Sequence, residues 1–115
     1  MKPHYLTPLF SPRNVAVIGA SDTPGSIGQS VFANLLAGNF QGKLFPVNLN
    51  HKVVGGIPAV PSVRLLEVPI DLAVVTTAIR SLPAIMKDCG KSGVKAVLLA
   101  KEFADSEQLE REILN

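Results

Sequence analysis

The stretch from Val15 to Gly28, VAVIGASDTPGSIG, decides how the fold of this 115-residue chain is interpreted. Four apolar residues lead directly into Gly19, and a small polar loop that contains two further glycines follows. A continuous apolar run without polar alternation is typical of a strand that is covered on both faces. A tight turn needs one glycine and not three, so the loop is expected to do more than turn the chain.

The remainder of the chain alternates between strand and helix patterns, which predicts βαβ units. We expect strands at 14–18, 43–48, 71–76 and 95–99, a loop with a short strand at 53–60, a turn or half-turn of helix at 61–69, and helices at 26–37, 82–91 and 105–114. Pro46 near the end of the second strand indicates an irregular or edge position. The predicted fold is α/β, a Rossmann-like doubly wound parallel sheet in a three-layer αβα arrangement.

The composition is that of a single domain, residues 1–115, with 47% hydrophobic and 17% charged residues. The chain ends at Asn115, within or just after the last expected helix, so we expect an N-terminal fragment of a larger multidomain protein that lacks the last strand of the sheet.

The balance of charge and of special residues excludes several classes of protein. A net charge of +2 without a cationic cluster argues against a nucleic-acid partner. The single cysteine, Cys89, cannot form an internal disulfide and is expected to be a small buried hydrophobe. No apolar stretch approaches the roughly 18 residues of a membrane helix. We therefore expect a cytoplasmic protein without a membrane partner.

The glycine loop has the features of an anion-binding site. Gly19 allows a sharp turn out of the first strand, and Gly25 and Gly28 remove side chains where a ligand or the sheet comes close. Ser26 can cap the following helix in a capping box with Gln29, and this helix directs free N–H groups at the loop. Further hydroxyl donors are Ser21, Thr23 and Ser26. The pattern predicts a phosphate or pyrophosphate cradle, although it is neither a GxGxxG fingerprint nor a P-loop.

The end of the second strand narrows the choice of ligand. Sites for NAD usually carry an acidic residue there, about 20 residues beyond the glycines. Asn48 occupies this position, and His51 and Lys52 follow it. A neutral amide does not repel a phosphorylated ribose, and the two following side chains can attract one. The residues thus favour CoA or NADP over NAD.

Several segments together resemble a known family: LFSPRNVAVIGAS, PGSIGQSVFANLLAGNFQGKLFPVN, GIPAVPSV and VPIDLAVVTT. They resemble the CoA-binding domain of NDP-forming acyl-CoA synthetases, which also opens the bacterial protein-lysine acetyltransferases fused to a GNAT domain. The chain is similar, more distantly, to the alpha subunit of succinyl-CoA synthetase. The resemblance runs from about Leu9 to Phe103.

The resemblance implies that the ligand is CoA or acetyl-CoA, a small-molecule thioester, and it assigns positions to three parts of it. The positions implied for the phosphates are Gly19, Ala20, Ser21, Gly25, Ser26, Ile27 and Gly28. Those implied for the adenosine and its 3′-phosphate are Val47, Asn48 and the stretch to His51. Those implied for the pantetheine arm are Thr76, Thr77 and Ala78. Catalysis in such families lies in other domains of the same polypeptide, such as an ATP-grasp or GNAT domain, and we find no catalytic set in this sequence.

Three positions depart from the family pattern, and they keep alternatives open. Asn50 stands where a lysine is frequent, Ala78 where a proline is common, and Glu102 where a glycine is usual. One alternative is an NADP-binding fragment of a reductase. Another is a degenerate domain that keeps the fold for regulation or oligomerisation, and a homo-oligomer is compatible with each hypothesis.

Overall fold

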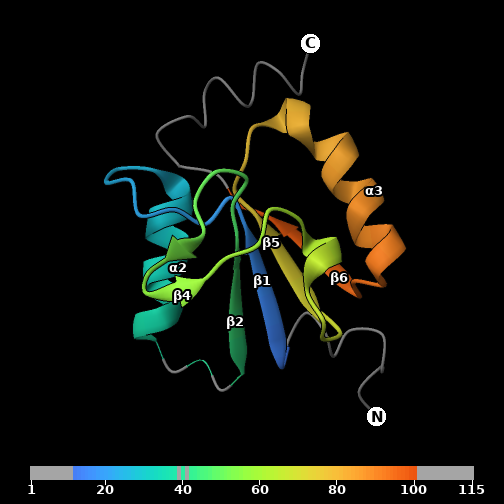
Figure 1. Cartoon of the computed structure of the whole chain (residues 1–115), viewed down its shortest axis with the longest axis horizontal. Coiled ribbons are helices and arrows are strands. Elements are labelled where there is room, and N and C mark those ends of the chain that lie inside the picture. Colours follow the sequence, from blue (N-terminus) through green and yellow to red (C-terminus); the bar gives the residue numbers. More distant parts are fainter. Residues whose placement is uncertain (1–11, 39, 41, 101–115) are drawn as a thin grey trace.

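The core of the protein is a four-stranded parallel sheet. The computed structural model describes residues 12–38, 40 and 42–100. The strands are β1 (Asn14–Ile18), β2 (Lys43–Val47), β5 (Leu72–Val75) and β6 (Ala96–Leu99), in the order β2-β1-β5-β6 (Figure 1). Every neighbouring pair in this sheet is parallel, so the predicted Rossmann-like α/β fold is confirmed.

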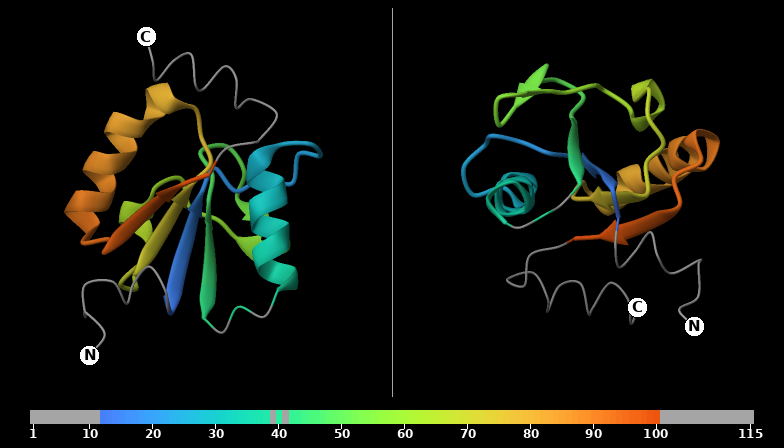
Figure 2. Two further views of the ribbon diagram at one scale, coloured as in Figure 1. Left: turned by 180° about the vertical axis from the view of Figure 1, so that it is seen from behind. Right: turned by 90° about the horizontal axis from the view of Figure 1, so that it is seen from below.

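Two helices cover opposite faces of the sheet (Figure 2). Side chains alternate along a strand, so Val15 and Val17 of β1 pack with Phe32 of α2 (Ile27–Ala37), which is only 1% exposed. Ala16 and Ile18 point to the other face, where they belong to a second hydrophobic cluster that includes Cys89 of α3 (Leu82–Ser92). This gives the three layers that the sequence predicts.

The segment between β2 and β5 differs from the expected loop with one short strand. It contains two short strands, β3 (Val53–Val54) and β4 (Ile57–Pro58), which pair with each other in an antiparallel hairpin. Gly55 and Gly56 connect them with φ values of +58° and +78°. Two successive residues with positive φ suit the two-residue hairpin turn, and this local turn lets the segment pair with itself. The isolated bridge between Val47 and Val60 joins its end to β2.

The other predicted elements are found where the sequence places them. Ser26 caps α2, Gly93 ends α3 with a φ of +72°, and a short 3₁₀ helix, η2 (Val63–Leu65), lies within 61–69. A second 3₁₀ helix, η3 (Ile79–Ser81), leads into α3. Pro46 lies on β2, an outer strand among those described, as expected. The expected helix at 105–114 and Glu102 lie outside the described residues. No helix of the described part is both long and apolar enough to span a membrane.

Candidate functional site

The candidate site lies at the carboxyl end of the sheet, where the strand order changes direction. The chain passes from β1 to β2 on one side and later returns to β5 on the other side of β1. Ligands of open parallel sheets bind at such a point. Gly19 follows β1, Asn48 follows β2 and Thr76 follows β5. Gly19 N donates to the Val47 carbonyl over 2.9 Å and Thr76 N donates to the Ile18 carbonyl over 2.9 Å, so the three strand ends are held together.

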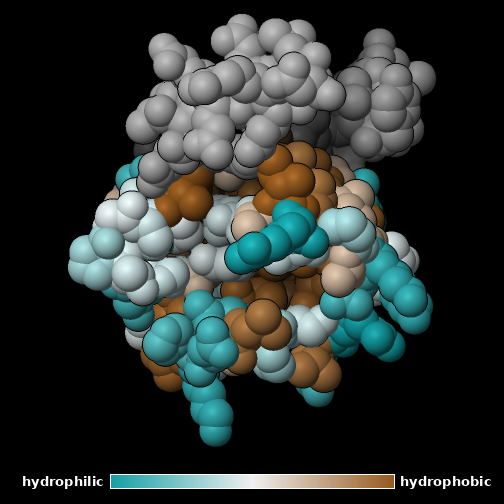
Figure 3. Space-filling view, turned by 90° about the horizontal axis from the view of Figure 1, so that it is seen from above, coloured by the Kyte–Doolittle hydropathy of each residue, from teal (hydrophilic) through white to brown (hydrophobic). Residues whose placement is uncertain are grey.

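A cleft of about 440 Å³ opens at this end, on the side of the sheet that α3 covers. The described residues that line it are Ile18, Gly19, Val47, Asn48, Leu49, Asn50, Pro61, Thr77, Ser81, Ala84, Ile85 and Asp88. Figure 3 looks onto this end of the molecule, where hydrophobic surface lies between hydrophilic side chains. Asp88 is the single charged side chain among the described lining residues, so the cleft suits the neutral parts of a ligand better than its anionic parts.

The glycines after β1 allow backbone segments to approach closely. Gly19 has a φ of +94°, and a Cβ atom there would lie 2.5 Å from Thr76 Oγ1 and 2.8 Å from Thr77 Cγ2. A Cβ atom at Gly28 would collide with the carbonyl oxygen of Gly19, so the prediction that Gly28 serves helix packing is confirmed. Gly25 has a φ of +83° but open space around it, so its backbone conformation alone accounts for the glycine.

The loop hydroxyls are used mainly within the loop itself. Ser26 Oγ accepts from Gln29 N over 3.1 Å and donates to the Thr23 carbonyl over 2.8 Å, while Ser21 Oγ accepts from Thr23 N over 2.9 Å. The proton of Ser26 is therefore already engaged, which leaves fewer hydroxyl donors for an anion than the sequence predicts. Within the part of the chain that the structure describes, the first two amides of α2, at Ile27 and Gly28, have no acceptor. An anion at this loop would depend on such amides.

Asn48 ties the glycine loop to the loop after β2. Its Nδ2 donates to the Ala20 carbonyl over 2.8 Å, and its Oδ1 accepts from the amides of Asn50 and His51 over 2.8 and 2.9 Å. Both polar ends of the side chain are thus occupied, and the half-buried amide holds two loops in place. Contact of Asn48 with adenosine stays a prediction, and a framework role accounts for this side chain without a ligand.

The remaining predicted positions divide into buried and accessible ones. Ala20 is buried in the core, Gly28 is buried beneath the loop, and Thr76 donates from Oγ1 to the Ile18 carbonyl over 3.0 Å. These three residues are thus part of the packing under the site and have little surface for a ligand. Accessible backbone or side-chain surface belongs to Ser21, Gly25, Ser26, Ile27, His51, Thr77 and Ala78. Among the residues described, the cleft is lined by Gly19, Val47, Asn48 and Thr77 of the predicted set, together with Leu49 and Asn50 of the stretch to His51.

The hydroxyl of Thr77, in contrast to that of Thr76, has no hydrogen-bond partner among the described residues. Its Oγ1 is buried. Most buried hydroxyls have a partner, and each exception calls for an explanation. Because Thr77 also lines the cleft, a polar group of a ligand there is a suitable partner.

The lining residues on α3 are absent from the set predicted from sequence. Ala84, Ile85 and Asp88 of α3, and Ser81 directly before it, follow one another at helical spacing and line one side of the cleft. Asp88 Oδ2 accepts from Ser62 Oγ over 3.2 Å. The sequence signal for this wall is the pattern of small and polar residues at i, i+3 and i+7. This pattern does not distinguish a helix face that lines a cleft from one that faces solvent.

Cys89 faces the core beneath this wall and not the cleft. It is buried, and burial together with the nearby negative charge of Asp88 raises the pKa of its thiol. A protonated, inaccessible thiol is a poor nucleophile, so Cys89 acts as the small hydrophobe that the sequence predicts.

Fold and cleft together define a Rossmann-like module that binds ligands at the carboxyl edge of a parallel sheet. Residues 13–113 match the family model of the CoA binding domain, and the chain belongs to this family. This confirms the resemblance inferred from the glycine loop and the end of the second strand.

The relatives that it matches include ADP-forming ligases. The chain is 38% identical over 96 residues to acetate–CoA ligase [ADP-forming] I subunit alpha of Pyrococcus furiosus, a match that covers 80% of this chain and 21% of that protein. It is 39% identical over 95 residues to acetate–CoA ligase [ADP-forming] of Methanocaldococcus jannaschii, covering 82% of this chain and 13% of that protein. The chain thus spans about a fifth or less of these curated relatives.

A solved structure of a longer chain contains the same fold. The dinucleotide forming acetyl-coenzyme A synthetase 1 of Ca. Korarchaeum cryptofilum, in complex with phosphate and ADP, superposes with a TM-score of 0.78 at 36% identity. The match covers 93% of this chain and 24% of that one. The similarity is therefore to about a quarter of that synthetase.

Proposed function

We propose that this chain binds CoA or an acyl-CoA such as acetyl-CoA as the nucleotide-binding module of an ADP-forming acyl-CoA synthetase. The observation that carries the proposal is the cleft at the strand-order reversal in a member of the CoA binding domain family. The relatives named above are ligases and synthetases, which supports a synthetase over the acetyltransferase alternative. In this proposal residues 1–115 form one domain, and further domains of a longer polypeptide, such as an ATP-grasp domain, carry the catalytic residues.

The charges of the site suggest how CoA would lie. The cleft beside α3 is apolar and carries the negative Asp88, so it suits the neutral pantetheine arm, with the Thr77 hydroxyl as partner for an amide. The phosphates suit the amides at the start of α2. The 3′-phosphate suits the exposed side of the loop after β2, where His51 and Lys52 lie.

Isothermal titration of the chain with CoA, acetyl-CoA, dephospho-CoA, NADP and NAD tests this proposal. We expect heat from CoA and acetyl-CoA, weaker binding of dephospho-CoA because it lacks the 3′-phosphate, and none from the nicotinamide nucleotides. Binding of NADP in preference to CoA would favour the reductase alternative instead. Absence of binding to every ligand would support a domain that keeps the fold without the ligand.

A pair of variants on α3 tests the place of binding. Ala84→Trp would fill the cleft from its α3 wall, whereas Met86→Trp adds the same side chain at an exposed position of the helix that does not line the cleft. We expect CoA affinity to fall more than about tenfold in the first variant and to stay within about twofold in the second, a difference of about 1 kcal/mol or more. Equal affinities would place the ligand elsewhere.

A further inference from the structure

A carboxylate of the glycine loop holds the hairpin that lies 33 residues further along the chain. Asp22 Oδ1 and Oδ2 accept from the amide of Gly55, over 3.0 and 3.2 Å. Gly55 opens the two-residue turn of the β3–β4 hairpin. The contact therefore joins the middle of the predicted phosphate loop to the tip of a separate element.

The same hairpin turn is seated on α2, the helix whose first turn follows the glycine loop. A Cβ atom at Gly55 would lie 2.9 Å from Phe32 Cε2 and 3.1 Å from Leu36 Cδ1, which shows how closely the turn packs on the helix. Asn48 provides a second link, from the base of the hairpin segment to the Ala20 carbonyl. The glycine loop is thus fixed on one flank by Asn48 and on the other by Asp22.

The charge of Asp22 makes its position informative. A carboxylate in a loop that receives phosphates repels them, and an anion-binding loop is better served by neutral or cationic residues. The hydrogen bond to Gly55 provides a structural reason for a carboxylate at this position, because the bond orients the glycine loop relative to the hairpin. Charge and positioning predict opposite effects when the side chain is changed.

We infer that Asp22 is a positioning residue: its carboxylate, through the Gly55 amide, couples the β3–β4 hairpin to the loop that receives the phosphates of CoA. The inference rests on the proposed function. Neither Asp22 nor the hairpin belongs to the set of ligand contacts predicted from the sequence.

Two substitutions at Asp22 separate positioning from charge. Asp22→Ala removes both acceptors and the charge, whereas Asp22→Asn removes the charge but keeps one acceptor oxygen. We expect Asp22→Ala to weaken CoA binding between about threefold and tenfold, the usual range for one hydrogen bond, and Asp22→Asn to stay within about twofold of the wild type. Stronger binding in both variants would show that only the charge matters and would overturn the inference.

A readout on the hairpin checks the route of the coupling. Amide hydrogen exchange at Gly55, followed by NMR, should accelerate in Asp22→Ala and stay slow in Asp22→Asn. The pair Gly55→Ala and Gly56→Ala adds a matched control: both residues have positive φ, but only a Cβ at Gly55 would press on Phe32 and Leu36. We expect Gly55→Ala to weaken CoA binding and Gly56→Ala to leave it near the wild type.

The outcomes distinguish this inference from the proposed function. A wild-type chain that fails to bind CoA contradicts the proposed function and the inference with it. A wild-type chain that binds CoA, together with an Asp22→Ala variant that binds equally well, contradicts the inference alone. Pantetheine, which lacks the phosphates, should bind the wild type and Asp22→Ala with the same affinity, because the coupling concerns the phosphate loop.

Discussion

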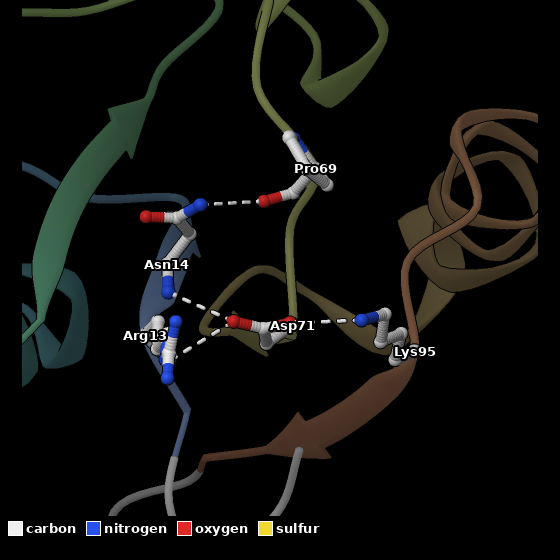
Figure 4. Close-up of polar contacts among 5 residues, drawn as sticks. All are labelled: Arg13, Asn14, Pro69, Asp71 and Lys95. Atoms are coloured by element: carbon white, nitrogen blue, oxygen red, sulfur yellow. Dashed lines mark hydrogen bonds and ion pairs between the residues drawn. The ribbon is translucent and has the colours of Figure 1, made fainter.

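At the amino end of the sheet one carboxylate bonds two backbone amides and a lysine, whereas at the carboxyl end several polar groups have no partner among the residues that the structure describes. Asp71, just before β5, accepts from the amides of Arg13 and Asn14 over 2.9 and 3.1 Å and pairs with Lys95 over 3.4 Å (Figure 4). Asn14 Nδ2 donates to the Pro69 carbonyl over 2.8 Å. This network links the starts of β1, β5 and β6, and Arg13, Asn14 and Pro69 also line a shallower, more open hollow of about 530 Å³ at this end.

The carboxyl end is arranged differently, although it belongs to the same strands. Thr77 Oγ1 is buried without a partner, and the first amides of α2 lack acceptors within the described residues. Among residues 12–38, 40 and 42–100, polar groups thus lack hydrogen-bond partners at the end where a ligand is proposed to bind. Substitutions at the two ends should therefore affect stability and binding in different proportions.

The largest effect should come from adding a methyl group where the backbones touch at the carboxyl end. Gly28→Ala would force its Cβ onto the Gly19 carbonyl, which is backbone and cannot move aside easily. We expect the free energy of unfolding to fall by about 3 kcal/mol, at the upper end of overpacking effects. Gly90→Ala, in α3 with open space around it, should instead raise stability by about 1 kcal/mol through helix propensity. Urea denaturation of both variants measures the difference, and equal effects would contradict the close approach.

The second effect concerns the amino end and depends on pH. Burial raises the pKa of Asp71, but the amides of Asn14 and Arg13 and the Lys95 ammonium outweigh it, so the pKa lies below its ordinary value of 3.8. Asp71→Ala should lower the free energy of unfolding by about 2 kcal/mol at neutral pH, the size expected for hydrogen bonds to a charged group.

The sign of the pH dependence follows from the lowered pKa of Asp71. The stabilisation is fully present above the ordinary value of 3.8 and is lost as the pH falls through the lower value of the folded state. Urea titrations of wild type and Asp71→Ala should therefore differ by a constant amount near neutral pH and converge in acid. A difference that grows toward low pH would contradict this assignment, and CoA affinity at neutral pH should not change.

Two threonine variants at the carboxyl end distinguish a side chain that stabilises the fold from one that is proposed to contact the ligand. Thr76→Val removes the hydroxyl that donates to the Ile18 carbonyl and should cost about 1 kcal/mol of stability. Thr77→Val removes a hydroxyl that has no partner in the described part of the chain, so stability should stay the same or rise by up to about 1 kcal/mol. We expect CoA binding to weaken in Thr77→Val although the protein is no less stable. A loss of stability in that variant would show that Thr77 is already satisfied in the free protein.

The fold could be predicted from the sequence because its signals are local. Residues 15–18 of the first strand are a continuous apolar run, Ser26 precedes a helical pattern by one residue, and Gly93 follows the next helix directly. Each signal lies within a few residues of the element that it defines. The hairpin was missed because Gly55 and Gly56 mark a turn equally well in a loop.

The details of the site depend on contacts between distant residues, which the sequence does not specify. Asn48 reaches back 28 residues to Ala20, and Asp22 reaches forward 33 residues to Gly55. A single sequence indicates that such residues are polar and near a strand end, but the partner is chosen by the packed fold. The sequence therefore predicts a ligand contact for Asn48 but not its bond to Ala20, and it gives no signal for the bond between Asp22 and Gly55.

The smallest expected effect comes from removing Lys95, which tests how much of the stabilisation by Asp71 is due to this cation and how much to the backbone amides. Lys95 is 56% exposed on its side chain, against 18% for Asp71, so its ion pair is screened by water and salt. Lys95→Ala should lower the free energy of unfolding by about 0.5 kcal/mol or less, and this small cost should vanish in high salt. Most of the contribution of Asp71 to the free energy of unfolding should persist in the Lys95→Ala variant, because the amides of Arg13 and Asn14 still donate to its carboxylate. A Lys95→Ala cost as large as that of Asp71→Ala would instead make the ion pair the main link between the strand starts, and the stability that the amino end contributes would then depend strongly on salt.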